Sequence, residues 1–195
     1  NKDKKTLELQ DVGLNSLYIA DCYALAEMAG IIGRLDEENE LLKRAEEFSQ
    51  RMQDIWDPDL GAFLNYRTDV DTTSSRVSPT MFYPLLAGVG DKDQMDRIVG
   101  YFYDTNKFYG EWILPSTTRD DPLFLDQKYW RGAIWPPLNF LTYLSLRKSG
   151  YYGASSELSE RSLELIMTEW NNKGYVSENY SSITGTGDDE RLSSD

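Results

Sequence analysis

The residues of this chain that could do chemistry are concentrated in two segments. The first combines the phenol of Tyr129, the indoles of Trp130 and Trp135, and the guanidinium of Arg131 around a glycine, Gly132. Aromatic rings cover the apolar faces of sugar rings, because both surfaces give up bound water when they stack. A guanidinium presents a fork of N–H donors to oxygen acceptors, and a glycine permits close approach of the backbone. This segment is therefore predicted to bind a carbohydrate.

Structural interpretations of two of these residues stay open. Trp135 stands at the start of a predicted helix, where it could instead be an aromatic residue of the core. Arg131 could hydrogen-bond hydroxyls or a charged aglycone, or it could form a structural ion pair with a neighbouring acid.

The second segment is Ser177-Glu178-Asn179-Tyr180, which places a carboxylate and a phenol on a loop flanked by glycines. The chain has no histidine, so imidazole bases, Ser-His triads and histidine-bound metals are excluded. Any acid–base chemistry must then be done by carboxylates or tyrosines. Taken alone, Glu178 could also be a solvated acid of a surface loop. Glu111 and Trp112 are predicted to lie on the same rim and to contact substrate.

Other acidic residues have simpler interpretations. Asp120, Asp121 and Asp126 are the nearest candidates for a catalytic acid within the chain, and a structural role is expected for each. The run Asp188-Asp189-Glu190 is expected to be solvated surface. Asp57-Pro58-Asp59 lacks the ligand spacing of a calcium loop and is predicted to be a turn. No metal site and no organic cofactor are predicted.

The formal charge of −13 argues against nucleic acid and anionic membranes as partners. It fits a neutral or cationic ligand, or solubility alone. With 195 residues, of which 40% are hydrophobic and 13% aromatic, the chain can bury the core of one domain. The single cysteine, Cys22, is expected to be a buried free thiol. No signal peptide and no apolar run of membrane-spanning length is recognised, so a soluble chain is expected, and its compartment stays open.

Six helices are predicted from apolar residues spaced three and four positions apart. Their ranges are 14–31, 36–55, 78–86, 91–102, 134–150 and 154–171. The first has its apolar face at Leu14, Leu17, Ala20, Ala24, Met28 and Ile31, and the fifth has its inner face at Ile134, Leu138, Leu141 and Leu144. Asp36 with Glu37 and Glu38 is predicted to cap the second helix and to complement its dipole. Ser78 with Pro79 is predicted to open the third.

Short connections alternate with long ones along the chain. The long ones run over 57–77, 105–129 and 172–195. Successive helices of a hairpin reverse direction, so all three long loops are expected at one end of the helices. The tryptophans lie in or beside these loops. A small β-hairpin is predicted at 57–66, where turn residues precede an alternating pattern. The expected architecture is a helical scaffold with an aromatic rim at one end.

The loop motifs, taken in order, resemble the C-terminal half of the catalytic domain of glycoside hydrolase family 63. They are Ser78-Pro79 with Phe82-Tyr83-Pro84-Leu85, Gly110-Glu111-Trp112-Ile113-Leu114-Pro115-Ser116, Arg119-Asp120-Asp121-Pro122, Gln127-Lys128-Tyr129-Trp130-Arg131-Gly132, and Ser177-Glu178-Asn179-Tyr180 followed by Thr184-Gly185. That family includes processing α-glucosidases and mannosylglycerate hydrolases, and trehalases are more distant relatives. The resemblance implies an all-α fold in which helical hairpins form part of an (α/α)6 toroid.

The resemblance also implies a reaction, the hydrolysis of α-glucosides or α-mannosides with inversion, by a Glu as general base and an Asp as general acid. The family's base lies in a Ser-Glu-x-Tyr loop, which gives that role to Glu178, with Asn179 and Tyr180 orienting the carboxylate or nearby hydroxyls. The family's acid lies in an Asp-Asn-Ser-Pro motif before the helix that matches 11–33, and this sequence has no such motif.

Residues 1–195 are therefore expected to be a single C-terminal fragment of a catalytic domain, acting on an oligosaccharide or small glycoside. The flanks of the helices are expected to pair with the missing half of the toroid or with another copy of the chain. Two other functions stay open, the first of them because the acid motif is absent. One is a carbohydrate-binding helical domain without catalysis, and the other is a helical scaffold for protein interactions.

Overall fold

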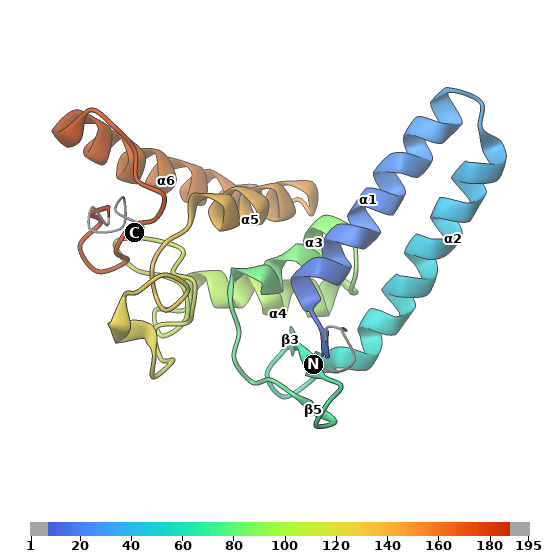
Figure 1. Ribbon diagram of the computed structural model, residues 1–195, viewed down its shortest axis with the longest axis horizontal. Coiled ribbons are helices and arrows are strands. Elements are labelled where there is room, and N and C mark those ends of the chain that lie inside the picture. The colour runs from blue at the N-terminus through green and yellow to red at the C-terminus, as the bar shows by residue number, and fades with distance from the viewer. Residues whose placement is uncertain (1–7, 188–195) are drawn as a thin grey trace.

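Three helical hairpins make up most of the computed structural model, which describes residues 8–187. The helices are α1 (Val12–Ile31), α2 (Leu35–Met52), α3 (Tyr83–Ala87), α4 (Lys92–Tyr103), α5 (Pro136–Lys148) and α6 (Tyr152–Lys173). α1 packs against α2 and α3, α3 packs against α5, and α5 packs against α6. In Figure 1 the α1–α2 hairpin stands on one side and the α5–α6 hairpin on the other, with α3 and α4 between them. Each of the six predicted helices is present.

α1 is apolar on two faces, and only one of them is covered. The covered face is made of Val12, Ser16, Ile19, Cys22, Ala26 and Ala29. The face predicted from the sequence is the other one, on which Leu14, Met28 and Ile31 are 59%, 61% and 78% exposed. Apolar side chains gain free energy by leaving water, so this open face can accept a further packing partner. Cys22 is a buried free thiol, as predicted.

Side-chain caps fix the start of two helices. Asp11 accepts a hydrogen bond from the Leu14 N–H at 2.7 Å where α1 begins, and Asp91 forms a reciprocal capping box with Gln94 where α4 begins. The prediction that Asp36 caps the second helix is wrong. α2 begins at Leu35, and Asp36 lies in its first turn, where its charge complements the helix dipole.

The third predicted helix is divided into a 3-10 turn, η2 (Pro79–Phe82), and the short α3. Pro84 has no N–H to donate to the carbonyl of Thr80, so a regular α-helix cannot run through this segment. Gly88 ends α3 with a φ of 71°, a conformation that glycine adopts without strain.

α5 buries a polar face. Asn139, Thr142 and Ser145 are almost fully buried, whereas the leucines of the predicted inner face are only partly buried. For Asn139, the physical reason is a loop that passes over it. Asn139 donates from Nδ2 to the carbonyl of Ile113 at 3.0 Å, because backbone groups of a buried loop need polar partners. The predicted start at Ile134 is also wrong, since α5 begins at Pro136.

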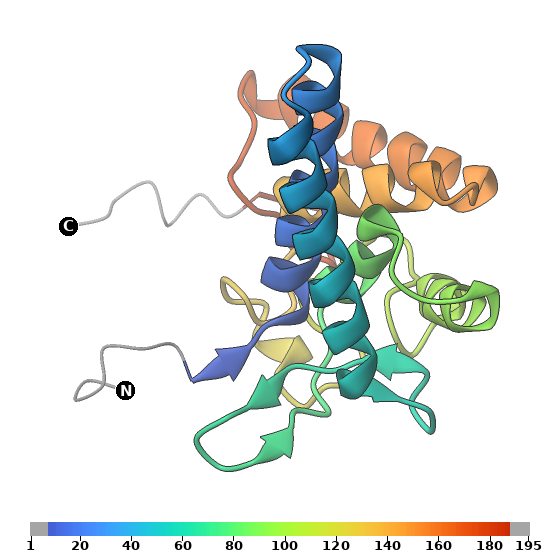
Figure 2. The same ribbon diagram turned by 90° about the vertical axis from the view of Figure 1, so that its right-hand side faces the viewer.

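The loop after α2 contains more strands than predicted. β2 (Trp56–Asp57) and β3 (Ala62–Phe63) form the predicted hairpin. The Asp57 carboxylate accepts from the N–H groups of Asp59 and Leu60, both at 2.9 Å, which confirms the predicted turn. A second, antiparallel sheet has the order β1-β4-β5, from β1 (Leu9–Gln10), β4 (Tyr66–Arg67) and β5 (Thr72–Thr73). Figure 2 shows both small sheets at the end of the molecule opposite the α1–α2 turn. Strands of two residues are too short to give an alternating pattern in the sequence.

The three long loops are joined to one another by side chains. Arg76 of the first loop pairs with Asp121 of the second at 2.7 Å. Gln127 of the second loop accepts a hydrogen bond at 2.9 Å from the N–H of Ser182 in the third. The loops therefore gather together, as predicted. Within residues 8–187, no helix has both the length and the apolar character that crossing a membrane requires.

Candidate active site

The aromatic segment before α5 is built on a pair of stacked indoles. The rings of Trp130 and Trp135 lie 4.1 Å apart at an angle of 14°. Trp135 is only 5% exposed and Trp130 is 49% exposed, so Trp135 lies beneath Trp130. The Trp135 Nε1–H donates to the carbonyl of Tyr129 at 2.9 Å, which fixes the inner indole to the turn above it. The structure thus places Trp135 in the packed interior, the alternative that the sequence left open, and presents Trp130 and Tyr129 to solvent.

The backbone that carries these rings has an unusual conformation. Gln127 and Tyr129 have positive φ values of 47° and 54°, and Gly132 has a φ of 97°. A Cβ atom on residue 132 would lie 2.3 Å from the carbonyl oxygen of Phe124. Glycine is therefore required here by the protein's own backbone. The Gly132 N–H donates to the Ser116 Oγ at 3.1 Å, which ties the segment to the preceding loop.

Arg131 forms an ion pair with Asp126 at 3.0 Å. This is the structural pairing that the sequence left open. The two side chains are 49% and 42% exposed, and exposed pairs contribute little to stability. A guanidinium has five N–H donors, so the pair with Asp126 leaves Arg131 able to donate to a ligand as well.

The Ser177–Tyr180 loop is paired with the aromatic segment. The Tyr180 N–H donates to the Ile134 carbonyl at 2.9 Å, and the Ile134 N–H donates to the Tyr180 carbonyl at 2.7 Å. The Tyr180 ring is fully buried, and its hydroxyl accepts a hydrogen bond from the Ser177 N–H at 3.1 Å. Burial raises the pKa of the Tyr180 phenol, so this group stays neutral. Asn179 is also buried, at 4% exposure.

Glu178 lies at the bend between Ser177 and Tyr180 and is exposed. Its carboxylate has no hydrogen bond or ion pair with any residue that the structure describes. Because Tyr180 pairs with Ile134, the predicted carboxylate and the aromatic segment belong to neighbouring backbone segments, although they are far apart in the sequence. The loop of Glu178 and the aromatic segment are therefore joined through the backbones of Tyr180 and Ile134.

Trp112 and Glu111 line one groove together with residues of α6, and Trp112 also packs inward. Trp112 packs with Ile134, Leu165 and Tyr180 in a small cluster under the loops. Gly185 lies against its indole, since a Cβ atom there would be 2.4 Å from the ring. Glu111 is exposed in a groove that it shares with acidic residues of α6. Trp112 thus supports Tyr180, and Glu111 faces α6. Of the remaining tryptophans, Trp56 packs on Phe63 and Trp170 lies exposed on α6.

The three alternative acids all have cationic partners. Asp120 pairs with Lys107 at 2.5 Å, Asp121 with Arg76 at 2.7 Å, and Asp126 with Arg131 at 3.0 Å. These pairs fit the structural role expected for each acid. The run Asp188-Asp189-Glu190 lies outside the described residues. Among residues 8–187, no group of three or more potential ligands is placed to hold a metal ion.

Several residues that hold the loops in place were missed by sequence reasoning. Gln127 donates from Nε2 to the Phe124 carbonyl at 2.8 Å, while its Oε1 accepts from Ser182. Glu169 of α6 is buried and accepts a hydrogen bond from the Ser177 hydroxyl at 3.0 Å. For Gln127 the only signal was its place directly before the aromatic segment. For Glu169 there was none, because a glutamate four residues before a lysine is the ordinary pattern of an exposed helix.

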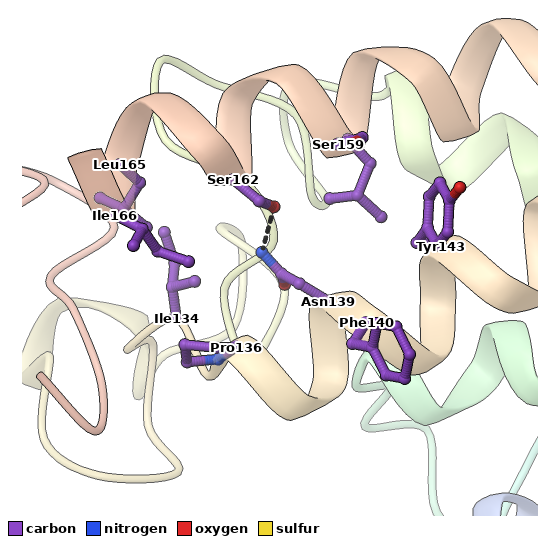
Figure 3. A pocket seen from close by; sticks show the side chains of 10 residues that line it. Ile134, Pro136, Asn139, Phe140, Tyr143, Ser159, Ser162, Leu165 and Ile166 are labelled. Carbon is purple, nitrogen blue, oxygen red and sulfur yellow. Dashed lines mark hydrogen bonds between the residues drawn. The ribbon is translucent and has the colours of Figure 1, made fainter. Parts of the chain in front are cut away.

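An apolar cleft of about 250 Å³ lies between α5 and α6, next to the aromatic segment. Figure 3 shows Ile134 and Pro136 at one end and Tyr143 at the other, with Asn139 reaching across to Ser162. That hydrogen bond measures 3.2 Å from Nδ2 to Oγ. Phe140, which also lines the cleft, is 60% exposed. This cleft has few of the polar groups that sugar hydroxyls need, and its character is that of a helix-packing surface.

Comparison with solved structures places the fold among the (α/α)6 toroids. A mannosylglycerate hydrolase of glycoside hydrolase family 63 from Thermus thermophilus, solved with glucose, superposes on 92% of this chain with a TM-score of 0.82 and 22% identity. The neutral trehalase of Saccharomyces cerevisiae superposes on 92% of the chain with a TM-score of 0.75 and 23% identity. The chain covers 44% of the first structure and 35% of the second. The three hairpins are thus part of such a toroid.

The sequence identifies the family. The mannosylglycerate hydrolase MGH1-like glycoside hydrolase domain matches residues 2–194, and the chain belongs to this family. The mannosylglycerate hydrolase MGH1 of Selaginella moellendorffii is 26% identical over 169 residues, which are 82% of this chain and 32% of that protein. The chain therefore spans about a third of the length of this relative. The likeness to the family 63 catalytic domain expected from the loop motifs is confirmed.

Proposed function

We propose that this chain contributes the general base and one wall of the sugar-binding site to an inverting α-glycosidase. The observation that carries the proposal is the position of Glu178. Its carboxylate is exposed at a bend whose two ends are fixed, and Tyr180, two residues further on, is paired with the segment that presents Trp130.

The chemistry asked of Glu178 is the removal of a proton from water. In an inverting hydrolysis, water attacks the anomeric carbon from the face opposite the leaving oxygen, and a second carboxyl protonates that oxygen. The base and the acid lie roughly 6.5–9.5 Å apart, which leaves room for the water. A base that accepts a proton in the transition state must reach the water directly, and Glu178 has no competing partner among residues 8–187. The general acid is proposed to come from a part of the protein outside residues 1–195.

The sugar is proposed to stack on Trp130. Tyr129 stands nearly perpendicular to that indole, at 83°, and bounds it on one side. Trp135 supports Trp130 from below, and Tyr180 and Trp112 support the loop of the base. Asn179, Arg131 and Glu111 remain the proposed polar contacts to hydroxyls or to the aglycone.

The substrate class is proposed to be an α-glucoside or an α-mannoside. The Thermus relative has been solved with glucose and with Tris and D-glycerate. A glycerate aglycone carries a carboxylate, which would suit the N–H donors of Arg131. Mannosylglycerate is therefore the first substrate to test, followed by a panel of α-glucosides.

The rest of the toroid is the proposed partner of the uncovered helix faces. The open face of α1 and the apolar cleft between α5 and α6 are surfaces that further hairpins would bury. Burial of such surface stabilises by roughly 25 cal/mol per Å².

The test uses the full-length protein and its Glu178→Gln variant. The glutamine keeps the shape of the side chain but cannot accept the proton, so kcat is expected to fall on the order of 1,000-fold while KM changes little. Proton NMR of the first sugar anomer released reports inversion. The control is Glu46→Gln, which alters an exposed glutamate on α2.

Two results would contradict the proposal. An undiminished kcat in Glu178→Gln would remove Glu178 as the base. If the full-length protein binds saccharides but hydrolyses none of them, the second candidate is favoured, a carbohydrate-binding helical domain. The absence of an Asp-Asn-Ser-Pro motif from this sequence is the observation that favours this candidate.

A further inference from the structure

Glu169 is a buried carboxylate with no part in the proposed chemistry. It lies on α6 and is 3% exposed. Its Oε1 accepts a hydrogen bond from the Ser177 hydroxyl at 3.0 Å and lies 2.9 Å from the Lys173 ammonium. Burying a carboxylate is unfavourable unless it is paired and hydrogen-bonded. Both partners of Glu169 meet that requirement, and one of them is the residue directly before Glu178.

The loop that carries Glu178 is therefore held from two sides. On one side, the Ser177 hydroxyl donates a hydrogen bond to Glu169 of α6. On the other side, Tyr180 is tied through its backbone to Ile134 of the aromatic segment. The Ser177 N–H donates to the Tyr180 hydroxyl and closes the loop between these anchors.

A third segment packs over the Glu169–Ser177 contact. A Cβ atom on Gly187 would lie 1.9 Å from the Ser177 Oγ and 2.4 Å from the Glu169 Oε1. The backbone at Gly187 thus covers this hydrogen bond and leaves no room for a side chain. A hydrogen bond shielded from water is stronger than one in solvent, and it is costly to break.

We infer that Glu169 is a positioning residue, which acts through Ser177 to hold Glu178 at a fixed place relative to the aromatic segment. This inference rests on the proposed function of Glu178. Its physical basis is that a displacement of about 1 Å in a reacting group can lower a rate on the order of 100-fold. The inner anchor at Ile134 fixes only one end of the loop, so the outer anchor at Glu169 is needed to fix the other.

The test compares three variants of the full-length protein. Glu169→Ala removes the acceptor and the charge, Ser177→Ala removes the donor, and Glu169→Gln keeps an acceptor oxygen while it removes the charge. We expect Glu169→Ala and Ser177→Ala to lower kcat by about 10- to 100-fold with KM changed less than about twofold. Glu169→Gln is expected to recover most of the activity, a rescue that a merely stabilising ion pair with Lys173 would not give.

The matched control is Ser155→Ala, which removes a buried hydroxyl and its hydrogen bond to the Tyr152 carbonyl at the other end of α6. It is expected to leave kcat unchanged. The second readout is hydrogen exchange of the peptide that contains the Ser177 amide. This amide is expected to exchange at least about tenfold faster in Glu169→Ala than in the parent protein, because the opened loop loses its bond to Tyr180.

The outcomes separate the inference from the proposed function. Faster loop exchange in Glu169→Ala, with no hydrolysis by the parent protein, supports the anchoring role and overturns the glycosidase. The inference alone is overturned if the parent is active, Glu178→Gln abolishes that activity, and the kcat of Glu169→Ala stays within about twofold of the parent. An equal loss of kcat in Ser155→Ala also overturns it, because the effect would then be one of general stability.

Discussion

Tyr180 and Ile134 donate to each other's carbonyls, with N···O distances of 2.9 Å and 2.7 Å. This exchange brings the loop after the last described helix against the segment that opens α5. The Tyr180 phenol is turned inward and binds the Ser177 N–H. The family resemblance makes Tyr180 a partner of the proposed base, Glu178. In the structure, Tyr180 instead binds the backbone of the loop that carries Glu178.

Replacing Tyr180 by Phe removes the acceptor of the Ser177 N–H and leaves that donor without its partner. The expected loss is about 1–3 kcal/mol in the free energy of unfolding, because a buried donor that loses its acceptor keeps its desolvation penalty. Urea unfolding of the full-length protein measures it. Tyr152→Phe is the control, since Tyr152 is 65% exposed. Equal stabilities of the two variants would argue against a structural role for the Tyr180 hydroxyl.

Trp130→Ala is expected to change KM, whereas Trp135→Ala is expected to change stability. Trp130 is half exposed and Trp135 is buried beneath it. Loss of Trp130 should raise KM about 10-fold or more with little effect on stability, since a sugar stacked on this indole would bury apolar surface worth roughly 25 cal/mol per Å². Loss of Trp135 should lower stability by about 3–5 kcal/mol, as for other large core residues. Steady-state kinetics and thermal unfolding distinguish them, and an unchanged KM in Trp130→Ala would count against the platform.

Gly132→Ala tests the strained turn of the aromatic segment. The new Cβ would meet the Phe124 carbonyl at 2.3 Å, and the φ of 97° is unfavourable for alanine. A destabilisation of about 1–3 kcal/mol or more is expected. Gly100→Ala is the matched control, because Gly100 lies in α4 with no atom within 4 Å of a new Cβ, and alanine there should stabilise by about 0.5–1 kcal/mol. Similar effects of both substitutions would contradict the close approach.

Tyr83→Phe should change how stability depends on pH. Burial, and next the charge of Asp11, raise the pKa of the Tyr83 phenol in the folded chain. The unfolded chain ionises first as the pH rises through about 10. The contribution of Tyr83 to stability is therefore complete below about pH 10 and is lost as the pH rises towards the folded-state pKa. Tyr83→Phe should therefore lose less stability than the parent between pH 8 and pH 11. Urea unfolding midpoints at these two pH values would measure the difference.

The same substitution has an expected effect at neutral pH. The Tyr83 hydroxyl is buried without a hydrogen-bond partner among the described residues. Its removal should be neutral or should stabilise by about 1 kcal/mol. A marked loss of stability at pH 7 would show that the hydroxyl has a partner elsewhere in the protein.

Met28→Glu tests whether the open face of α1 is covered in the full-length protein. Met28 is 61% exposed in the described chain. If further hairpins cover it, a charge there should cost about 2 kcal/mol or more. Val70→Glu is the control on a loop, where the side chain is 52% exposed and the expected change is within about 0.5 kcal/mol. Equal effects of the two substitutions would place the α1 face in solvent.

Much of the fold could be predicted because helix periodicity is a local property. The α4 helix follows from the capping residue Asp91 and from apolar residues such as Ile98 and Phe102. Which face of a helix is covered depends instead on elements far away in the sequence. α5 buries Asn139 because the loop of Ile113 crosses it, and α1 leaves Met28 open because nothing in the described chain packs there.

The candidate site shows the same division. The alternation of short and long connections was enough to place the aromatic segment and the Glu178 loop together. The stacking of Trp130 on Trp135 and the burial of Glu169 could not be predicted, because each depends on a turn conformation or a contact that leaves no periodic trace. The assigned roles of Glu178 and its neighbours stay predictions until the variants are measured.

The ion pair of Arg76 with Asp121 joins the first long loop to the second, and the amide of Gln127 joins the second to the third. Each loop must therefore have the length that brings its partner residue into reach. A loop grafted from a related enzyme would have to bring its attachment points with it. Exchange of substrate specificity between relatives is therefore expected to succeed when the three loops are transplanted together, and to give misfolded or inactive chimaeras when only one is moved.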